Sequence, residues 1–461
     1  MMQLSQAAQW MPGAHMCGDS NATVLRVHTD TRTTEPGDLF VALRGESFDA
    51  NNFLEDAQRR GAVAAVCLPG MGAHLENFPR IEVPDTKLAL GALATAWRRQ
   101  FQLPLIAVTG SNGKTTVTQM LASILDAAAS GDASLATRGN LNNDIGVPLT
   151  LLRLRSTHRW AVVELGMNHP GEIASLALMA QPTIALVNNA QREHLEFMGT
   201  VDAVAQENGA VIGALHAGGC AVFPADDAYT SYWSALATSC ATRTFAIDPV
   251  SSNTHPPTVH CVNAEWGGTG WRVHARSQGL DLPYTLTIAG RHNIKNSLAA
   301  IACALAAGVP PDAVIRGLEA FRPVKGRSRA LQLQQGLRSC TVIDDTYNAN
   351  PDSVRAAIDV LSELPPPRLL VLGDMGEVGD QGPQFHAEVG RYAKERGIEQ
   401  LKVLGALAMS ASDAFAGATH FDTMDALVAS VQMEIPHMAS VLVKGSRFMR
   451  MERVVEALNA R

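Results

Sequence analysis

The residues most able to do chemistry lie in segment 110–116, which reads GSNGKTT. An apolar stretch, 105–108, precedes it and a helical pattern follows it, so backbone N–H groups and a helix N-terminus should point at one place, where a phosphate is the natural ligand. The common phosphate loop has a further glycine where this chain has Val108, so the loop is shorter than usual. Lys114 would reach the terminal phosphates, and the Thr115 hydroxyl would bind Mg²⁺. The expected nucleotide-binding residues are Gly110, Ser111, Asn112, Gly113, Lys114, Thr115 and Thr116; the alternative is a tight turn with a chance lysine.

Two further groups follow neighbouring apolar segments that read as strands. Glu164 ends WAVVE, and His194 lies just past TIALV. Because ligands of open α/β sheets collect at the carboxyl ends of the strands, both groups are expected beside the phosphate loop. A lone histidine after a strand is often structural, so the prediction depends on the three features together. Asn142 and Asn143 form a polar turn that either caps a helix or binds a polar ligand.

The elements that position these residues are typical of an α/β protein. The chain has 461 residues, 46% of them hydrophobic, and about 150 residues per domain suggests three domains. Strand and helix patterns alternate through the middle of the chain, which indicates a parallel sheet covered by helices. The predicted domains are a small N-terminal α/β domain (1–84), a central ATPase-type parallel sheet (85–322) and a C-terminal Rossmann-like domain (323–461), with a hinge at FRPVKGRSR.

Charge and cysteine usage exclude several classes of function. The formal net charge is −7 with no block of like charge, so we expect no nucleic-acid partner and no membrane partner. No stretch approaches the apolar length of a membrane span, and we expect a cytoplasmic protein. The seven cysteines are scattered without a CxxC pair, which argues against a disulfide framework and a zinc site.

Longer motifs carry a resemblance to a known family. GSNGKTT, TRGNLNNDIGVPLTLL, VELGMN, GRHNIKNSLAA, VKGRS, IDDTYNANPDSV, LGDMGEVG and VLVKGSRFMRME occur in this order. They resemble the Mur ligases of bacterial peptidoglycan synthesis, and the last motifs resemble the branch that adds D-alanyl-D-alanine to UDP-N-acetylmuramoyl-tripeptide. The segment DTRTTEPGDLFVALRGESFDANNF resembles that family's UDP-binding domain.

The resemblance implies an ATP- and Mg²⁺-dependent amide ligase. Such enzymes phosphorylate the acceptor's terminal carboxylate to an acyl phosphate, which an amine then attacks. It also implies a cytoplasmic monomer that acts in cell-wall biogenesis, and hence in cell shape and division. A folylpolyglutamate synthase or a Mur ligase of another step shares the phosphate loop, and a nucleotide-switched binding protein is an alternative of a different class.

Residue roles follow from the positions of these motifs. The resemblance implies that Lys114, Glu164, His194, Arg327 and Asp345 are catalytic, and that Asn293, Asn296 and Arg327 lie near the nucleotide. Substrate-binding residues would be Asp30, Arg32, Asn140, Asn142, Asn143, Asn348 and Asn350. Helix capping is the alternative for the asparagines, and exposure at the surface is the alternative for the arginines.

The chain departs from the family at one position of the metal site. Most members carry a lysine whose carbamate bridges the metal ions, whereas the aligned segment VAQENGAVI has Asn208 there. We expect Glu207 to supply the missing charge beside Thr115, Glu164 and His194, since a carboxylate is also a hard oxygen ligand. Neighbouring helical positions do not share a face, so a solvated helix residue is the alternative.

Overall fold

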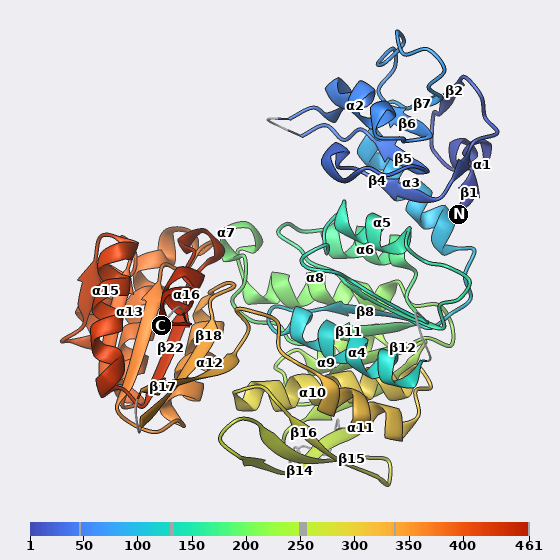
Figure 1. The fold of residues 1–461 in the computed structure, drawn as a ribbon. Helices are drawn as coiled ribbons and strands as arrows, with labels where there is room; N and C mark the ends of the chain where they lie inside the picture. Colours follow the sequence, from blue (N-terminus) through green and yellow to red (C-terminus); the bar gives the residue numbers. More distant parts are fainter. Residues whose placement is uncertain (46–47, 130–132, 249–255, 336–337, 460–461) are drawn as a thin grey trace.

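A nine-stranded sheet forms the centre of the molecule (Figure 1). The computed structural model describes residues 1–45, 48–129, 133–248, 256–335 and 338–459. The strand order is β16-β15-β14-β13-β12-β11-β8-β10-β9, parallel from β9 to β14 and antiparallel beyond β14. The strands are β8 (Leu105–Thr109), β9 (Ser134–Ala136), β10 (Trp160–Glu164), β11 (Ile184–Val187), β12 (Cys220–Pro224), β13 (Ala241–Ala246), β14 (Val259–Trp266), β15 (Trp271–Ser277) and β16 (Leu280–Leu286). Because β8 lies between β10 and β11, the ends of these three strands meet at one edge.

Helices cover both faces of the central sheet, as alternation along the strands requires. Leu105 and Ala107 face one apolar core, whereas Ile106 and Val108 face the other. The first core contains residues of α5 (Gly146–Leu151), α6 (Glu172–Ala180), α8 (Val201–Gly213) and α9 (Thr230–Leu236), and the second contains residues of α4 (Lys114–Ala128), α10 (Arg291–Ala306) and α11 (Pro311–Ala320). The short helix α7 (Leu195–Met198) lies at the side facing the C-terminal domain (Figure 1).

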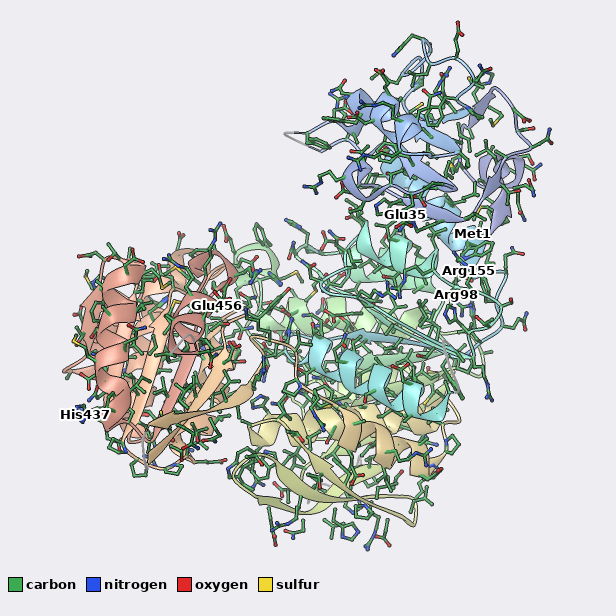
Figure 2. The ribbon with its side chains drawn as sticks, in the orientation of Figure 1. Met1, Glu35, Arg98, Arg155, His437 and Glu456 are labelled. Carbon is green, nitrogen blue, oxygen red and sulfur yellow. The ribbon has the colours of Figure 1, made fainter. Side chains whose placement is uncertain are left out.

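The N-terminal domain is built on a five-stranded sheet of order β2-β7-β6-β5-β4, with β2 antiparallel to β7 and the other pairs parallel. Helix α3 (Thr86–Arg98) packs against α5 and α6 and joins the two domains. Arg155 lies at this junction (Figure 2) and donates from Nη2 to the Leu25 carbonyl at 3.0 Å. The remaining elements are β1 (Met2–Gln3), α1 (Leu4–Gln9), β2 (His15–Cys17), β3 (Thr23–Val24), β4 (Arg26–His28), η1 (Thr31–Thr33), β5 (Asp38–Val41), η2 (Ala50–Phe53), α2 (Leu54–Arg59), β6 (Ala64–Cys67) and β7 (Arg80–Glu82).

The C-terminal domain is a six-stranded sheet of order β17-β18-β22-β19-β20-β21, in which only β17 is antiparallel to its neighbour. Apolar cores lie on both faces, against α12, α13 and α14 on one side and α15 and α16 on the other. The elements are β17 (Arg329–Gln335), β18 (Arg338–Asp345), α12 (Pro351–Ser362), β19 (Arg368–Gly373), η3 (Gly379–Gln381), α13 (Gly382–Glu395), β20 (Gln400–Leu404), α14 (Met409–Phe415), β21 (Thr419–Phe421), α15 (Met424–Glu434), η4 (Ile435–His437), β22 (Ser440–Lys444), η5 (Arg447–Met449) and α16 (Glu452–Asn459).

The predicted fold class is confirmed: each of the three parts is an α/β unit, and the central sheet is parallel around the phosphate loop. The strands of the three large sheets span residues 15–82, 105–286 and 329–444. The expected divisions after residues 84 and 322 fall between them and stay predictions. All seven cysteines are free. Within the described part of the chain, no helix has the length and hydropathy needed to cross a membrane.

Candidate functional site

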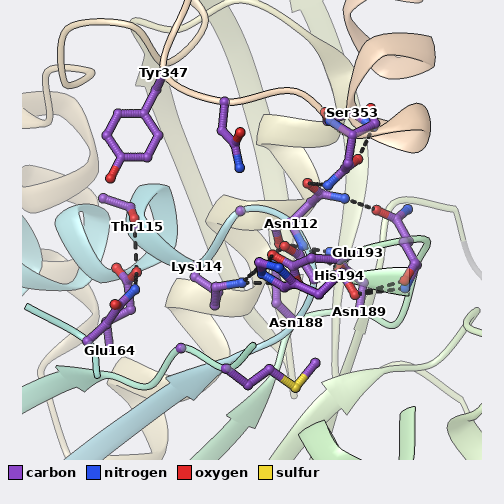
Figure 3. A pocket seen from close by; sticks show the side chains of 18 of the residues that line it. Asn112, Lys114, Thr115, Glu164, Asn188, Asn189, Glu193, His194, Tyr347 and Ser353 are labelled. Atoms are coloured by element: carbon purple, nitrogen blue, oxygen red, sulfur yellow. Dashed lines mark hydrogen bonds and ion pairs between the residues drawn. The ribbon is translucent and has the colours of Figure 1, made fainter. Parts of the chain in front are cut away.

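A cleft of about 1040 Å³ opens where the strand ends of the central sheet face loops of the C-terminal domain (Figure 3). Ligand pockets usually measure about 300–1,000 Å³, so the cleft has room for a nucleotide and part of a second substrate. The predicted site residues that line it are Ser111, Asn112, Gly113, Lys114, Thr115, Thr116, Asn140, Asn142, Asn143, Glu164, His194, Asn293, Asn296, Arg327, Asp345, Asn348 and Asn350. Four others are not among the lining residues: Gly110, Asp30, Arg32 and Glu207.

The phosphate loop joins β8 to α4 as predicted, and helix α4 begins at Lys114. Gly113 precedes the helix with φ +84°. A Cβ atom at this position would lie 2.5 Å from Asn296 Oδ1 and 2.6 Å from Asn188 Nδ2. A side chain here would be strained by the positive φ and would displace the amide groups of Asn296 and Asn188, so glycine is favoured at this position.

Buried amide groups fix the loop from the other side. Asn188 Nδ2 donates to the Asn112 carbonyl at 2.8 Å and to Asn296 Oδ1 at 2.9 Å, and Asn296 Nδ2 donates to Asn293 Oδ1 at 2.8 Å. No side chain caps the N-terminus of α10, so Asn293 and Asn296 are not capping residues. They support the phosphate loop within the cleft.

Thr115 and Glu164 meet at the base of the cleft (Figure 3). Glu164 Oε1 accepts hydrogen bonds from Thr115 Oγ1 at 3.1 Å and from Asn142 Nδ2 at 2.7 Å, whereas its buried Oε2 has no partner. A buried carboxylate oxygen without a partner beside a hydroxyl is a hard oxygen donor set that suits Mg²⁺. Residues Thr115 and Glu164 thus fit the implied ion, although the described residues contain no group of three His, Cys, Asp or Glu side chains arranged around one point.

Lys114 and His194 are each paired with carboxylates in the cleft. Lys114 Nζ donates to the Gly110 carbonyl at 2.6 Å and to Glu193 Oε1 at 2.9 Å. His194 Nδ1 lies 2.7 Å from Glu377 Oε2 of the C-terminal domain, an ion pair without hydrogen-bond alignment, and its Nε2 lies 3.5 Å from Glu193. Burial lowers the pKa of His194, but the two carboxylates outweigh burial and raise it to about 9. A raised pKa favours the protonated imidazole at neutral pH, and His194 would have to lose that proton before it could bind a metal ion.

The C-terminal domain contributes a buried ion pair. Asp345, at the end of β18, lies 2.6 Å from Lys444 Nζ, at the end of β22, and its other oxygen accepts from Ser328 N at 2.9 Å. Burial alone would raise the pKa of Asp345, but the Lys444 ammonium outweighs it and lowers the pKa below its ordinary value. Lys444 also donates to the Asn348 carbonyl at 2.8 Å. The pair therefore fixes the loop that carries Asn348 against two strand ends.

Asn350 caps a helix, which is the alternative that the sequence left to substrate binding, and it also reaches across the cleft; its substrate role stays a prediction. Its side chain accepts from Ser353 N at 2.8 Å, as the N-cap of α12. Its Nδ2 also donates to Asn112 Oδ1 of the phosphate loop at 3.0 Å. Capping and a contact across the cleft thus occur together.

Arg327 lies in the segment between the second and third sheets, where a hinge is predicted. Its guanidinium stacks 4.0 Å from the centre of the Tyr347 ring, and that of Arg447 lies 5.6 Å from the same ring. All three line the cleft. The cleft therefore has cationic groups on the C-terminal side as well as at the phosphate loop.

The remaining predicted residues lie elsewhere. Asp30 and Arg32 pair with each other at 2.7 Å in the N-terminal domain, and the Arg32 guanidinium lowers the pKa of Asp30 to about 2. Glu207 accepts from Gly171 N at 2.8 Å and from Ile173 N at 2.7 Å. The structure thus gives both of its oxygens to the N-terminus of α6, where a carboxylate is favoured, instead of to the metal site.

Asn208, the next residue of the same helix, lies about 100° further round the helix axis and contacts a different element. It is fully buried, and its Oδ1 accepts from Thr109 Oγ1 at 2.7 Å at the end of β8. Asn208, which the resemblance places where a lysine is expected, therefore contacts the strand that leads into the phosphate loop.

Sequence reasoning missed several residues of the cleft. Glu193 carried a signal, since it directly precedes His194, and Lys444 carried one as a lysine at the end of an apolar strand. Asn188 directly follows β11, and Glu377 lies in LGDMGEVG just past β19, so the strand-end signal was present for both as well.

Comparison with known proteins agrees with this geometry. Residues 108–304 match the Mur ligase middle domain, and residues 326–447 match the Mur ligase, glutamate ligase domain. The chain is 38% identical to the UDP-N-acetylmuramoyl-tripeptide–D-alanyl-D-alanine ligase of Escherichia coli strain K12, over 95% of this chain and 94% of the relative. It is also 38% identical to the Haemophilus influenzae protein of the same name, over 99% and 97% of the two chains.

Solved structures give the same result. The crystal structure of MurF from Acinetobacter baumannii superimposes with a TM-score of 0.89 at 34% identity and covers 100% of this chain and 98% of that one. The match extends over the N-terminal domain and the cleft alike, so the likeness is not restricted to the phosphate loop. The chain belongs to the Mur ligase family.

Proposed function

We propose that this protein uses ATP and Mg²⁺ to join D-alanyl-D-alanine to UDP-N-acetylmuramoyl-tripeptide, giving the pentapeptide precursor of peptidoglycan. The observation that carries the proposal is a single cleft lined by a phosphate loop, a carboxylate with an unpartnered oxygen, and the Asp345–Lys444 pair from a second domain. Its relatives of that name match the chain over nearly its full length. We further propose that the enzyme is a cytoplasmic monomer.

The first half of the reaction takes place at the phosphate loop. The N-terminus of α4 and the backbone N–H groups before it bind the phosphates of ATP. Lys114 exchanges its contact with Glu193 for the terminal phosphate, and Thr115 with Glu164 would hold Mg²⁺, which neutralises charge on the phosphates. The acceptor's carboxylate oxygen attacks the γ-phosphorus, the bond to ADP breaks, and an acyl phosphate forms.

The second half takes place toward the C-terminal domain. The dipeptide's ammonium group first loses a proton to water. The neutral amine then attacks the acyl carbon, and the tetrahedral intermediate collapses as the C–O bond to phosphate breaks and the departing phosphate takes up the amine proton. Asp345 has a lowered pKa and is a weak base, so we assign it the binding of the incoming ammonium group and not its deprotonation. Asn348 and Asn350 lie on the same loop and are assigned to the dipeptide.

The acceptor would extend from the cleft to the N-terminal domain. Asn140, Asn142 and Asn143 line the cleft at the end nearer α5. Asp30 and Arg32 lie in the N-terminal domain, and we assign them to the uridine nucleotide end of the substrate. In this arrangement the acceptor would contact the N-terminal and central domains, and the dipeptide would contact the C-terminal domain.

The test is phosphate release from ATP and Mg²⁺ with UDP-N-acetylmuramoyl-tripeptide, with and without D-alanyl-D-alanine, with the product identified by mass spectrometry. We expect release that requires the dipeptide and yields the pentapeptide precursor. Release that is indifferent to both substrates would refute the proposal and favour the nucleotide-switched binding protein.

A further inference from the structure

Arg192 makes a dense set of polar contacts between the central and C-terminal domains. Its guanidinium donates to Asp352 Oδ1 from Nε at 3.0 Å and from Nη2 at 2.6 Å, and its backbone N donates to Asp352 Oδ2 at 2.8 Å. The same guanidinium donates to Glu388 Oε2 from Nη1 at 2.8 Å and to Oε1 from Nη2 at 3.0 Å. One side chain thus binds two carboxylates on two different helices, α12 and α13.

The surroundings fix this geometry. The guanidinium lies 5.3 Å from the centre of the Phe385 ring, and Arg355 Nη1 donates to Glu388 Oε1 at 3.2 Å. The side chains of Arg192, Asp352 and Glu388 are 23%, 22% and 30% exposed. A partly buried guanidinium that donates several hydrogen bonds to carboxylates is held in one orientation. Ordinary surface ion pairs lack this directionality.

The contact lies next to reacting groups on both sides. On the central domain, Arg192 directly precedes Glu193 and His194, which contact Lys114 and Glu377. On the C-terminal domain, Asp352 lies in the first turn of α12, two residues after Asn350, whose amide reaches the phosphate loop. A displacement of the Arg192 contact would therefore separate the phosphate loop from the loop assigned to the dipeptide.

We infer that Arg192 is a positioning residue that docks the C-terminal domain on the ATP-binding domain through Asp352 and Glu388. Arg192 touches no reacting atom. It affects the amide-forming step because it sets the distance between the two sides of the cleft. The kinetic part of the inference rests on the proposed function, whereas the docking part does not.

The first experiment measures docking without any substrate. Small-angle X-ray scattering of Arg192→Ala should show a longer maximum dimension than the wild type, because the C-terminal domain is released. Arg192→Lys should lie between the two, since an ammonium cannot bind both carboxylates in two-pronged fashion. Arg391→Ala is the matched control, as an exposed arginine on α13 that does not line the cleft.

The second experiment is kinetic. We expect Arg192→Ala to raise KM for D-alanyl-D-alanine about tenfold or more and to change KM for ATP less than threefold, because the phosphate loop itself is intact. Glu388→Ala should have a smaller effect of the same kind and should add little in the Arg192→Ala background, as coupled residues do. Equal increases in both KM values would indicate a general structural defect and refute the positioning role.

The inference would be overturned if Arg192→Ala had the same scattering profile as the wild type and a KM for the dipeptide within twofold of the wild-type value. If Arg192→Ala does not fold, as shown by loss of the native circular dichroism spectrum, the same scattering and KM measurements are made on Glu388→Ala, which removes the contact from the C-terminal domain. If the wild type forms no pentapeptide precursor and Arg192→Ala still expands, the proposed function fails and the docking inference stands.

Discussion

Replacing Lys444 with methionine tests the buried ion pair at the C-terminal side of the cleft. The Lys444 side chain is 4% exposed and that of Asp345 is 15% exposed. The mutation removes the ammonium 2.6 Å from Asp345 Oδ2 and leaves only Ser328 as a close hydrogen-bond donor to this carboxylate. Breaking one side of a buried pair costs about 3–5 kcal/mol, because the remaining charge is uncompensated.

Protonation of Asp345 limits the penalty of leaving its charge unpaired and makes that penalty depend on pH. The ordinary pKa of the group is 3.8, so taking up a proton at pH 7 costs about 4 kcal/mol at roughly 1.4 kcal/mol per unit, and at pH 5 about 2 kcal/mol. In the wild type the pKa is lowered, and the resulting stability is present above pH 4 and lost below it. In Lys444→Met the pKa is raised instead, so the destabilisation grows as pH rises.

We expect Lys444→Met to lose about 3–4 kcal/mol of unfolding free energy at pH 7 and about 2 kcal/mol or less at pH 5. Hydrogen exchange of β18 and β22 amides, combined with urea unfolding, reports this domain separately from the others. Lys402→Met is the matched control, since this buried lysine lies 3.6 Å from Glu434, whose side chain is 31% exposed, and its loss should cost less. A cost below about 1 kcal/mol at pH 7, or equal costs at both pH values, would refute the reasoning.

Three further substitutions test the central domain. Gly113→Ala should weaken ATP binding at least tenfold by calorimetry, because of the positive φ and the contact with Asn296; unchanged affinity would contradict the loop geometry. Glu164→Gln should reduce turnover about a hundredfold or more and weaken the dependence on Mg²⁺, with little change in stability, whereas near-normal turnover would exclude it as a ligand. Glu207→Gln should lower the free energy of unfolding by about 1–2 kcal/mol and leave kcat within about threefold; loss of turnover without loss of stability would return Glu207 to the metal site.

The sequence was informative where structure is local. The phosphate loop could be predicted from an apolar strand, two glycines and a helical pattern, because these features follow from backbone preferences within about twenty residues. The ends of β8, β10 and β11 could be expected to meet, since parallel strands share an edge. The family resemblance then placed Arg327 and Asp345 at the cleft, where the structure has them.

The sequence was uninformative where contacts depend on the order of strands or the packing of domains. Lys444 meets Asp345 only because β22 lies next to β18, and no periodicity in the chain encodes that neighbour. Arg192 and Asp352 are 160 positions apart. The place of Glu207 shows the same limit on a smaller scale, since one helical step turns its carboxylate toward α6 while Asn208 faces Thr109.

The cleft has a further property that follows from its charges. Two basic side chains of the central domain that line the cleft already have a carboxylate partner: Lys114 with Glu193, and His194 with Glu377. A phosphate that binds Lys114 therefore exchanges one anion for another, and Glu193 then keeps His194 Nε2, at 3.5 Å, as its cationic neighbour. Glu377 differs from Glu193 because it comes from the C-terminal domain, so its release from His194 loosens one contact between the domains. The contacts of Arg192 with Asp352 and Glu388 do not involve the reacting groups, and they can keep the cleft assembled while Lys114 and His194 change partners.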